Sequence, residues 1–590
     1  MAEDRSIMAM ARKKVHWDTG KVLFIFSVAI AAFLVCVPVG FLLWESLTTK
    51  GGDLTLANFY KYLARGNVRE AIFNTLLVSI GISGLGCVLG VTLAFGVSRT
   101  NMWGKRLVRS AVIISVMTPP FLLTLAYIIL GGPNEGMVNK LLRGWFNLST
   151  TYGPINVYSI WALIVLGVPM GTAVIFLMTF PALENMDPYL EEAARTSGAS
   201  PLRSAFDVTI PLVKPAILSG MMLAFGQTVA MYGVPRMLNI NVLTLVIRES
   251  LVIMDFKGGA VLSVIITVLS LAVVFLYRWS LRSGKRYNTI SAKGFRPNVM
   301  RLGGGRHIFT ALGILYAIFA FLLPYATLIT ASFMKSVGQG LHLDNFTLYN
   351  YTSIFDSAET WVALKNSFYL AFGTASIVVL VGLVIAYILV RTKVRGRGAL
   401  EYLCNIPMGI SGTALAMGLI FMYLTPPLSE LKLYGTLGII LVAYCTRQLP
   451  SGVRYSQSSL LQISVELEEA SRVAGAGWIR TMVKITIPLI KTSLVYAWIL
   501  SFINAFPELS TSVMLRNAGT SVVATAILEL WDGAGGLPQA AAFGSVVFLV
   551  VAFLVMVAQR AVGASMLKEK ASSKESVGVI RHRQFAHLMK

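Results

Sequence analysis

One segment of 25 residues occurs twice in this chain, and this duplication constrains the fold more than any other feature. Residues 191–215 read EEAARTSGASPLRSAFDVTIPLVKP, and residues 468–492 read EEASRVAGAGWIRTMVKITIPLIKT. Matched positions stand 277 residues apart without a gap, which chance does not explain. The repeat therefore predicts two halves with the same architecture.

Strongly apolar runs surround both copies. Hydrophobic residues make up 56% of the chain and charged residues 13%, against about 25% charged in an ordinary soluble domain. Runs of about 20 apolar residues are long enough to cross a bilayer as helices. We therefore predict an all-α polytopic membrane protein with about twelve transmembrane helices in two parallel six-helix repeats. The expected spans lie near 22–44, 71–97, 108–131, 157–180, 213–232, 258–279, 308–330, 367–391, 400–424, 435–458, 489–513 and 538–560.

Charge and composition divide the chain further. We expect a first repeat at 1–290, a basic linker at 291–307, a second repeat at 308–565 and a polar tail at 566–590. The net charge is +23, and the loops at 98–109 and 280–307 contain basic residues without an acid. The positive-inside rule places such loops, and with them both termini, in the cytoplasm. The basic excess thus indicates membrane topology, and nucleic acid is not an expected partner.

The repeated segment lies in a polar loop in each half, at 181–212 and 459–488, which we call the first and second elbow. Asp187 and Pro188 form a typical helix start, and the glutamates after them fall in the first turn, where the helix dipole favours acids. Gly198 and Gly475 are predicted to end that helix in the left-handed conformation. Each elbow is thus expected to be two short helices outside the bilayer.

The pattern E-E-A-A-x-x-x-G-A, followed by I-P-L, resembles the "EAA" loop of permease subunits in bacterial binding-protein-dependent ABC importers. In that family the loop is a coupling helix that inserts into a cleft of the cytoplasmic ATPase. The second copy departs from the pattern at Ser471 and at Gly477-Trp478. The resemblance implies a type I permease fold and assigns ATPase coupling to Glu191, Glu192, Ala193, Arg195, Gly198 and Ala199, and to Glu468, Glu469, Ala470, Arg472, Gly475 and Ala476.

The same resemblance implies the partners and the location. These are two copies of the ATPase subunit, a periplasmic substrate-binding protein, and one permease chain per complex in the bacterial inner membrane. The sequence itself has no phosphate-binding loop, since Gly104-Lys105 and Gly284-Lys285 lack the rest of the motif. No catalytic constellation and no metal-ligand spacing is evident. We therefore expect a non-enzyme without a cofactor of its own, with ATP and Mg²⁺ on the ATPase.

A few polar residues inside the spans are candidates for the translocation path. Arg447 lies near the middle of the tenth predicted span, and Glu508 lies close to Asn504 in the eleventh. Gln227 and Tyr232 occupy the equivalent stretch of the first half. Ionisable residues at this depth are costly and usually face the bundle interior. These residues either face the substrate or only join helices around proline breaks, and the sequence leaves both alternatives open.

Two further segments bear on the substrate. Y-G-V-P at 232–235 and P-E-L-S-T-S-V-M-L at 507–515 resemble fused permeases for ferric iron, with phosphonate and thiamine permeases as close alternatives. A secondary transporter driven by an ion gradient is the alternative of another class. It would need several acids within the membrane, and Glu508 is the one good candidate. A membrane enzyme is disfavoured because His, Asp and Cys do not cluster.

Overall fold

The computed structural model describes residues 2–49, 51–147, 152–282, 300, 302–533 and 536–557. Regular secondary structure in these ranges is helical, as predicted. The predicted tail at 566–590 lies outside the described residues, as does most of the predicted linker at 291–307.

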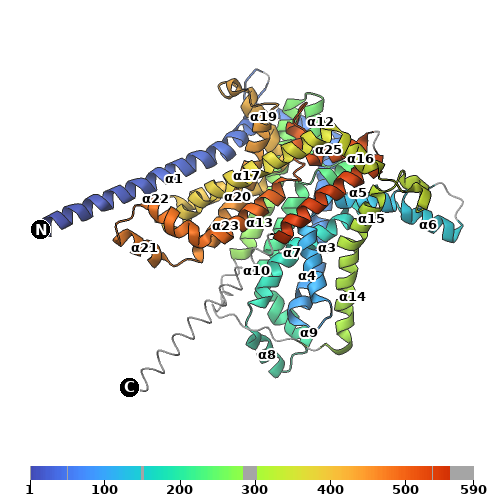
Figure 1. Cartoon of the computed structure of the whole chain (residues 1–590), viewed down its shortest axis with the longest axis horizontal. Coiled ribbons are helices and arrows are strands. Elements are labelled where there is room, and N and C mark those ends of the chain that lie inside the picture. The colour runs from blue at the N-terminus through green and yellow to red at the C-terminus, as the bar shows by residue number, and fades with distance from the viewer. Residues whose placement is uncertain are drawn as a thin grey trace.

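The first half contains six long segments (Figure 1). These are α1 (Ala2–Leu47), α3 (Gly66–Arg99), the pair α4 (Lys105–Met117) and α5 (Pro120–Gly131), α7 (Ile160–Glu184), α10 (Ile210–Val229) and α13 (Phe256–Arg282). Shorter helices connect them: α2 (Ala57–Leu63), α6 (Met137–Phe146), α8 (Pro188–Thr196), α9 (Pro201–Ser204), α11 (Gly233–Met237) and α12 (Leu243–Val252).

The second half repeats this order. Its long segments are α14 (Arg306–Ala317) continuing into α15 (Leu323–Ser332), α17 (Ala358–Arg391), the pair α18 (Arg397–Asn405) and α19 (Gly412–Leu424), α20 (Leu437–Leu461), α23 (Ile487–Ala505) and a last helix at Gly536–Val557. The connecting helices are α16 (Tyr349–Asp356), α21 (Val465–Val473), α22 (Trp478–Thr481), α24 (Ser512–Leu515) and α25 (Val523–Asp532).

The predicted spans are found in place, with two changes of shape. Nine helices in the described ranges are long and apolar enough to cross a membrane, and two bent pairs bring the total to eleven. The predicted spans 108–131 and 400–424 are not straight helices, because each is broken in the middle by a bend of 105° or 109°. Pro119-Pro120 and Pro407 lie at these breaks, where proline removes a backbone donor. The remaining predicted span corresponds to α20, which is less apolar because it carries polar residues such as Arg447.

Each half is built around a close pair of helices, α3 with α7 and α17 with α20. Glycines permit the contact: a Cβ on Gly86 would lie 2.8 Å from the carbonyl carbon of Gly171, and one on Gly382 would lie 2.6 Å from that of Gly452. Small residues allow membrane helices to approach in this way. Helices α10 and α23 complete a three-helix unit in each half.

The first helix of each half covers the opposite half. Helix α1 packs against α17, α18 and α19, whereas α14 and α15 pack against α4 and α5. The largest buried apolar cluster accordingly contains residues of both halves, such as Leu122 and Leu415. The two repeats therefore form one intertwined bundle.

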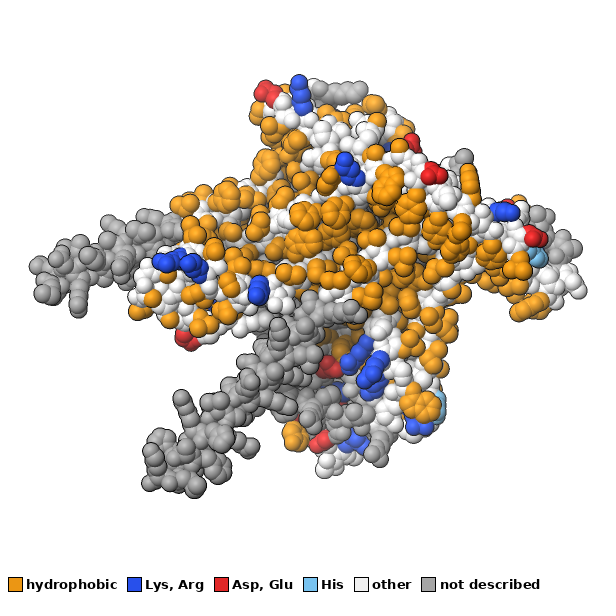
Figure 2. Space-filling view, viewed as in Figure 1, with side chains coloured by type: hydrophobic (Ala, Val, Ile, Leu, Met, Phe, Trp, Pro, Cys, Tyr) orange, Lys and Arg blue, Asp and Glu red, His pale blue; other side chains and the backbone are white. Residues whose placement is uncertain are grey.

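The outer surface fits a bilayer. Figure 2 shows hydrophobic side chains over the middle of one face, with charged side chains gathered toward its edges. Helix α3, for example, exposes Phe73, Ile80 and Val88. Apolar side chains on the outside of long helices are expected where lipid is the solvent.

Candidate functional site

Both elbows have the predicted two-helix form. In the first elbow the Asp187 side chain caps α8 by accepting a hydrogen bond of 2.9 Å from the Tyr189 amide. The residues that follow α8 and α21 turn through Gly198 at φ +89° and Gly475 at φ +87°. The left-handed conformation predicted for both glycines is thus confirmed. Figure 1 shows α8 and α21 on the side of the molecule opposite α12 and α25.

The first glutamate of each repeat is buried, so the structure does not place it on the surface that a partner would contact. Glu191 is 3% exposed and Glu468 is 1% exposed. An oxygen of Glu191 accepts a hydrogen bond of 2.8 Å from Thr209 Oγ1. In the second elbow, Glu468 accepts from Thr486 at 3.4 Å. The two acids therefore close each elbow onto the start of the next long helix.

A buried arginine faces each of these glutamates. Arg99 Nε lies 3.7 Å from Glu191 Oε1, and Arg391 Nε lies 3.2 Å from Glu468 Oε1. Each arginine also donates through Nη2 to two backbone carbonyls at the end of the long helix that leads into the elbow, which is α7 in the first half and α20 in the second. The carbonyls are those of Leu183 and Met186 for Arg99, at 2.7 and 3.1 Å, and those of Leu460 and Ile463 for Arg391, at 2.8 and 2.7 Å.

We call these two groups the elbow anchors: Arg99, Glu191 and Thr209 in the first half, and Arg391, Glu468 and Thr486 in the second. Each anchor joins the end of α3 or α17 to the elbow and to the helix after it. Sequence reasoning counted the two arginines only as loop charges. Each arginine is the last residue of the second long helix of its half, which marks the two as equivalent but does not identify the glutamate as their partner.

The remaining predicted coupling residues lie at or near the surface. Glu192, Ala193, Arg195 and Gly198 are exposed, as are Glu469, Ala470 and Gly475, whereas Ala199, Arg472 and Ala476 are half-buried. Exposed apolar side chains lie next to them, and patches of such side chains are typical of protein interaction sites. These are Tyr189, Leu190 and Phe206 in the first elbow, and Leu467, Val473, Ile479 and Val483 in the second.

The second elbow has two contacts with α17 that the first elbow lacks with α3 among the described residues. Arg472 donates a hydrogen bond of 2.9 Å to the Tyr387 hydroxyl, and the Trp478 ring meets the Tyr387 ring edge-on at 5.6 Å. Phe95 lies four residues before Arg99, as Tyr387 does before Arg391, and it has no hydroxyl to accept such a bond. The second elbow therefore has a side-chain connection to α17 through Tyr387 that has no counterpart in the described part of the first.

A central cavity of about 420 Å³ lies between the halves. Its wall includes both helix breaks, at Thr118–Phe121 and Pro407–Ile410, and the ends of α10 and α23. Irregular backbone at membrane depth is tolerated where it lines such a cavity. All five predicted path residues line it: Gln227, Tyr232, Arg447, Asn504 and Glu508.

The two charged members of this set, Arg447 and Glu508, are paired. Arg447 Nη1 lies 3.4 Å from Glu508 Oε1, with side chains 34% and 10% exposed. Their mutual contact, and the partial exposure of Arg447 to the cavity, offset part of the cost of placing two charges here.

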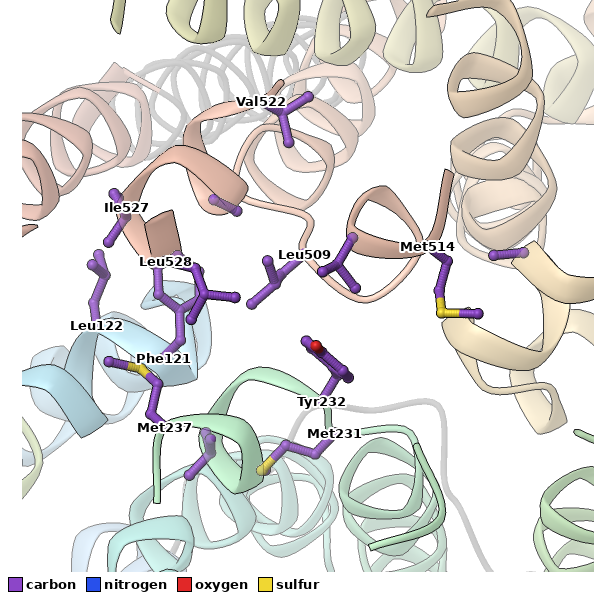
Figure 3. Packing of buried hydrophobic residues seen from close by; sticks show 14 of the residues in the cluster. Phe121, Leu122, Met231, Tyr232, Met237, Leu509, Met514, Val522, Ile527 and Leu528 are labelled. Carbon is purple, nitrogen blue, oxygen red and sulfur yellow. The ribbon is translucent and has the colours of Figure 1, made fainter. Parts of the chain in front are cut away.

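An apolar layer bounds the cavity. Phe121, Tyr232 and Leu509 line it, and they belong to the same buried cluster as Met237 and Leu528 of α11 and α25. Figure 3 shows these side chains converging from both halves. The layer therefore separates the cavity from the α12 and α25 side of the molecule.

Two segments of the chain, residues 86–283 and 378–568, match the family described as binding-protein-dependent transport system inner membrane component. A ferric transport system permease protein of Actinobacillus pleuropneumoniae is 25% identical over 93% of this chain and 79% of its own length. A putative ferric transport system permease protein of Haemophilus influenzae is 25% identical over 87% and 81%. A putative 2-aminoethylphosphonate transport system permease protein of Salmonella typhimurium is 26% identical over 44% of this chain and 91% of its own.

Proposed function

Because the chain belongs to the family of binding-protein-dependent transport system inner membrane components, an ABC importer permease family, we propose that it forms the entire pore of its importer. The proposal rests mainly on the observation that one chain contains two elbows, each held by its anchor, on the same side of the molecule. A two-fold ATPase dimer needs two docking sites, and this chain supplies both. The complex would thus contain one permease chain and two ATPase subunits, which carry the ATP and Mg²⁺.

The elbows are the proposed docking sites. Each presents exposed polar positions beside exposed apolar side chains, which suits a protein cleft better than lipid headgroups. This placement assigns the elbows, the basic loops and both termini to the cytoplasm. The α12 and α25 side would then face the periplasm and receive substrate from the binding protein.

A transmission route follows from the anchors. Helix α10 begins at the first elbow and carries Gln227 to the cavity near its other end, and α23 does the same with Asn504. Closure of the ATPase dimer on ATP draws the elbows together. Each anchor makes its elbow move with the three-helix unit behind it, so the apolar layer parts and the cavity opens outward. Hydrolysis returns the elbows to their starting positions.

Ferric iron is the proposed substrate, delivered by the binding protein. Support comes from the two ferric permease relatives, which match over most of the chain, whereas the phosphonate permease matches over less than half. A phosphonate such as 2-aminoethylphosphonate, thiamine or another small solute is the second candidate. An ion-gradient mechanism has less support, since Glu508, its one candidate acid, already accepts several hydrogen bonds.

Uptake by reconstituted complexes tests the proposal. The full chain is placed in proteoliposomes with candidate ATPase and periplasmic binding-protein subunits, and radioactive ferric iron uptake is followed with and without ATP. ATP-dependent uptake that needs the binding protein is expected. Uptake that follows an imposed ion gradient without ATP would instead support the secondary transporter.

A further inference from the structure

Among the described residues that line the central cavity, the charged ones, Arg447 and Glu508, both come from the second half. Arg447 in α20 and Leu166 in α7 hold equivalent positions, since each stands three residues before a proline within its helix. Glu508 corresponds to Met231 by the 277-residue repeat. The first half thus has apolar residues at both equivalent positions, and of these Met231 lines the cavity. Because buried charges are costly, and the architecture does not need them here, the pair serves another purpose.

The Glu508 carboxylate is already saturated with donors. It accepts hydrogen bonds from the Thr511 amide at 3.1 and 3.2 Å and from the Ser512 amide at 3.4 Å. The Thr511 hydroxyl also donates to it. With 10% of the side chain exposed, this carboxylate has little capacity left to bind a cation.

Arg447 is in the opposite situation. Its guanidinium makes no hydrogen bond within the described residues, and the ion pair with Glu508 at 3.4 Å is its one charged contact there. A third of its side chain is exposed to the cavity. Gly412 makes room for it, since a Cβ at that position would overlap Arg447 Nη1. A guanidinium carries five N–H donors in a fixed fork, so several remain available to a ligand.

The other polar side chains of the cavity wall are also suited to a ligand with acceptor oxygens. Gln227 and Asn504 occupy equivalent positions in the repeat and bring one amide from each half to the cavity. Within the described ranges, no group of three or more His, Cys, Asp or Glu could hold a metal ion. A bare ferric ion, which prefers oxygen anions, therefore finds no ligand set here. A ligand with acceptor oxygens finds a fork of donors.

We propose that the central cavity binds a small oxyanion through Arg447, with Gln227 and Asn504 beside it. This inference rests on the proposed importer function and specifies its substrate class. The oxyanion is either the substrate itself, such as a phosphonate, or the anion that accompanies ferric iron as a complex. Arg447 provides the paired, planar donors that carboxylate and phosphate groups match, and Glu508 holds it in place.

Thermal unfolding of the full-length chain in nanodiscs tests this binding directly. Inorganic phosphate, citrate and ferric citrate are titrated against chloride at equal ionic strength, and the rise in midpoint gives an apparent affinity. The wild-type chain should be stabilised beyond the chloride baseline. A response to phosphate or citrate alone identifies a free oxyanion, whereas a response to ferric citrate alone identifies the complex.

Three variants make the result specific. Arg447→Gln should weaken binding at least about tenfold, the loss expected for charge-assisted hydrogen bonds. The double variant Arg447→Leu with Glu508→Met copies the first half, so it should fold and lose the response. Arg454→Gln removes an exposed arginine seven residues further along α20 and should leave binding unchanged.

Two outcomes would overturn the inference: no stabilisation of the wild type above chloride, or equal stabilisation of Arg447→Gln. Neither would touch the proposed importer function, because this measurement needs no ATPase or binding protein. Conversely, absence of ATP-dependent uptake with normal anion binding would reject the importer and leave the cavity site standing.

Discussion

Removal of Arg391 is expected to release the second elbow without unfolding the chain. Arg391→Met leaves Glu468 as an uncompensated carboxylate at 1% exposure, and breaking a buried pair in this way costs about 3–5 kcal/mol. The carbonyls of Leu460 and Ile463 also lose their donor, at about 1 kcal/mol each. The elbow escapes the penalty by opening toward water, so the cost falls on this loop and spares the buried helices.

A double variant distinguishes the effect of the uncompensated Glu468 charge from the effect of the lost hydrogen bonds. Arg391→Met with Glu468→Gln removes the orphan carboxylate, so the remaining cost falls to the lost hydrogen bonds, about 2–3 kcal/mol. The single variant should therefore be more damaging than the double variant. Lys393→Met, an exposed basic residue two positions away, is the matched control.

Hydrogen exchange and coupled ATP hydrolysis provide the measurements. A local cost of at least about 5 kcal/mol corresponds to more than a thousandfold faster exchange of the amides at 465–486. Stimulation of ATP hydrolysis by the loaded binding protein should be lost while the amount of inserted chain stays normal. Unchanged exchange in Arg391→Met, or equal damage in the single and double variants, would refute the role given to the anchor.

Three further predictions concern the elbows, the helix contacts and the stoichiometry. Valine at Gly198 or Gly475 should cost about 1 kcal/mol or more in backbone strain and should abolish transport while the amount of inserted protein stays normal. The control Gly477→Val, at φ −70° with open space around it, should transport normally. Normal transport with both Gly198 and Gly475 replaced would show that the elbows are not the coupling elements. Gly382→Leu should force α17 away from α20 and so lower the yield of folded protein measured by gel filtration. Gly398→Leu should not lower this yield, because a Cβ at Gly398 would have no atom within 4 Å. Equal yields of the two variants would contradict the close packing of α17 and α20. Native mass spectrometry of the solubilised complex should show one permease chain with two ATPase subunits, and two permease chains would contradict a single-chain pore.

Much of the fold was predictable because the bilayer restricts the options. Apolar length alone located the spans, and the gapless repeat gave the two halves and their matching elbows. Local backbone chemistry gave the left-handed turns at Gly198 and Gly475. The breaks in the two bent helix pairs were not predicted, because a run of apolar residues has the same composition whether its helix is straight or bent. Pro119-Pro120 was the one indication of a bend in the first pair.

The candidate site was predicted only in part, since partners distant in sequence decide it. Burial cost singled out Arg447 and Glu508, and their contact in the structure follows from the same physics. The anchors were missed because Arg99 and Glu191 are 92 residues apart, and the sequence around either residue does not indicate that the two side chains are in contact. The helix dipole gave a sufficient local reason for Glu191, which concealed its burial against an arginine.

Symmetry and asymmetry in this chain follow the two tasks it performs. In the proposed importer, a two-fold ATPase dimer would push on two elbows at once, so each elbow would need its own rigid connection, and the anchors occur in both halves. The cavity lies between the halves, where a single ligand needs one charged anchor point. A second charged pair at Leu166 and Met231 would add a charge to the wall of a cavity of about 420 Å³ at Met231 and a further one outside the cavity at Leu166, and each would have to be desolvated. Retained symmetry at the elbows and lost symmetry at the cavity are therefore the expected products of one duplication under two different physical demands.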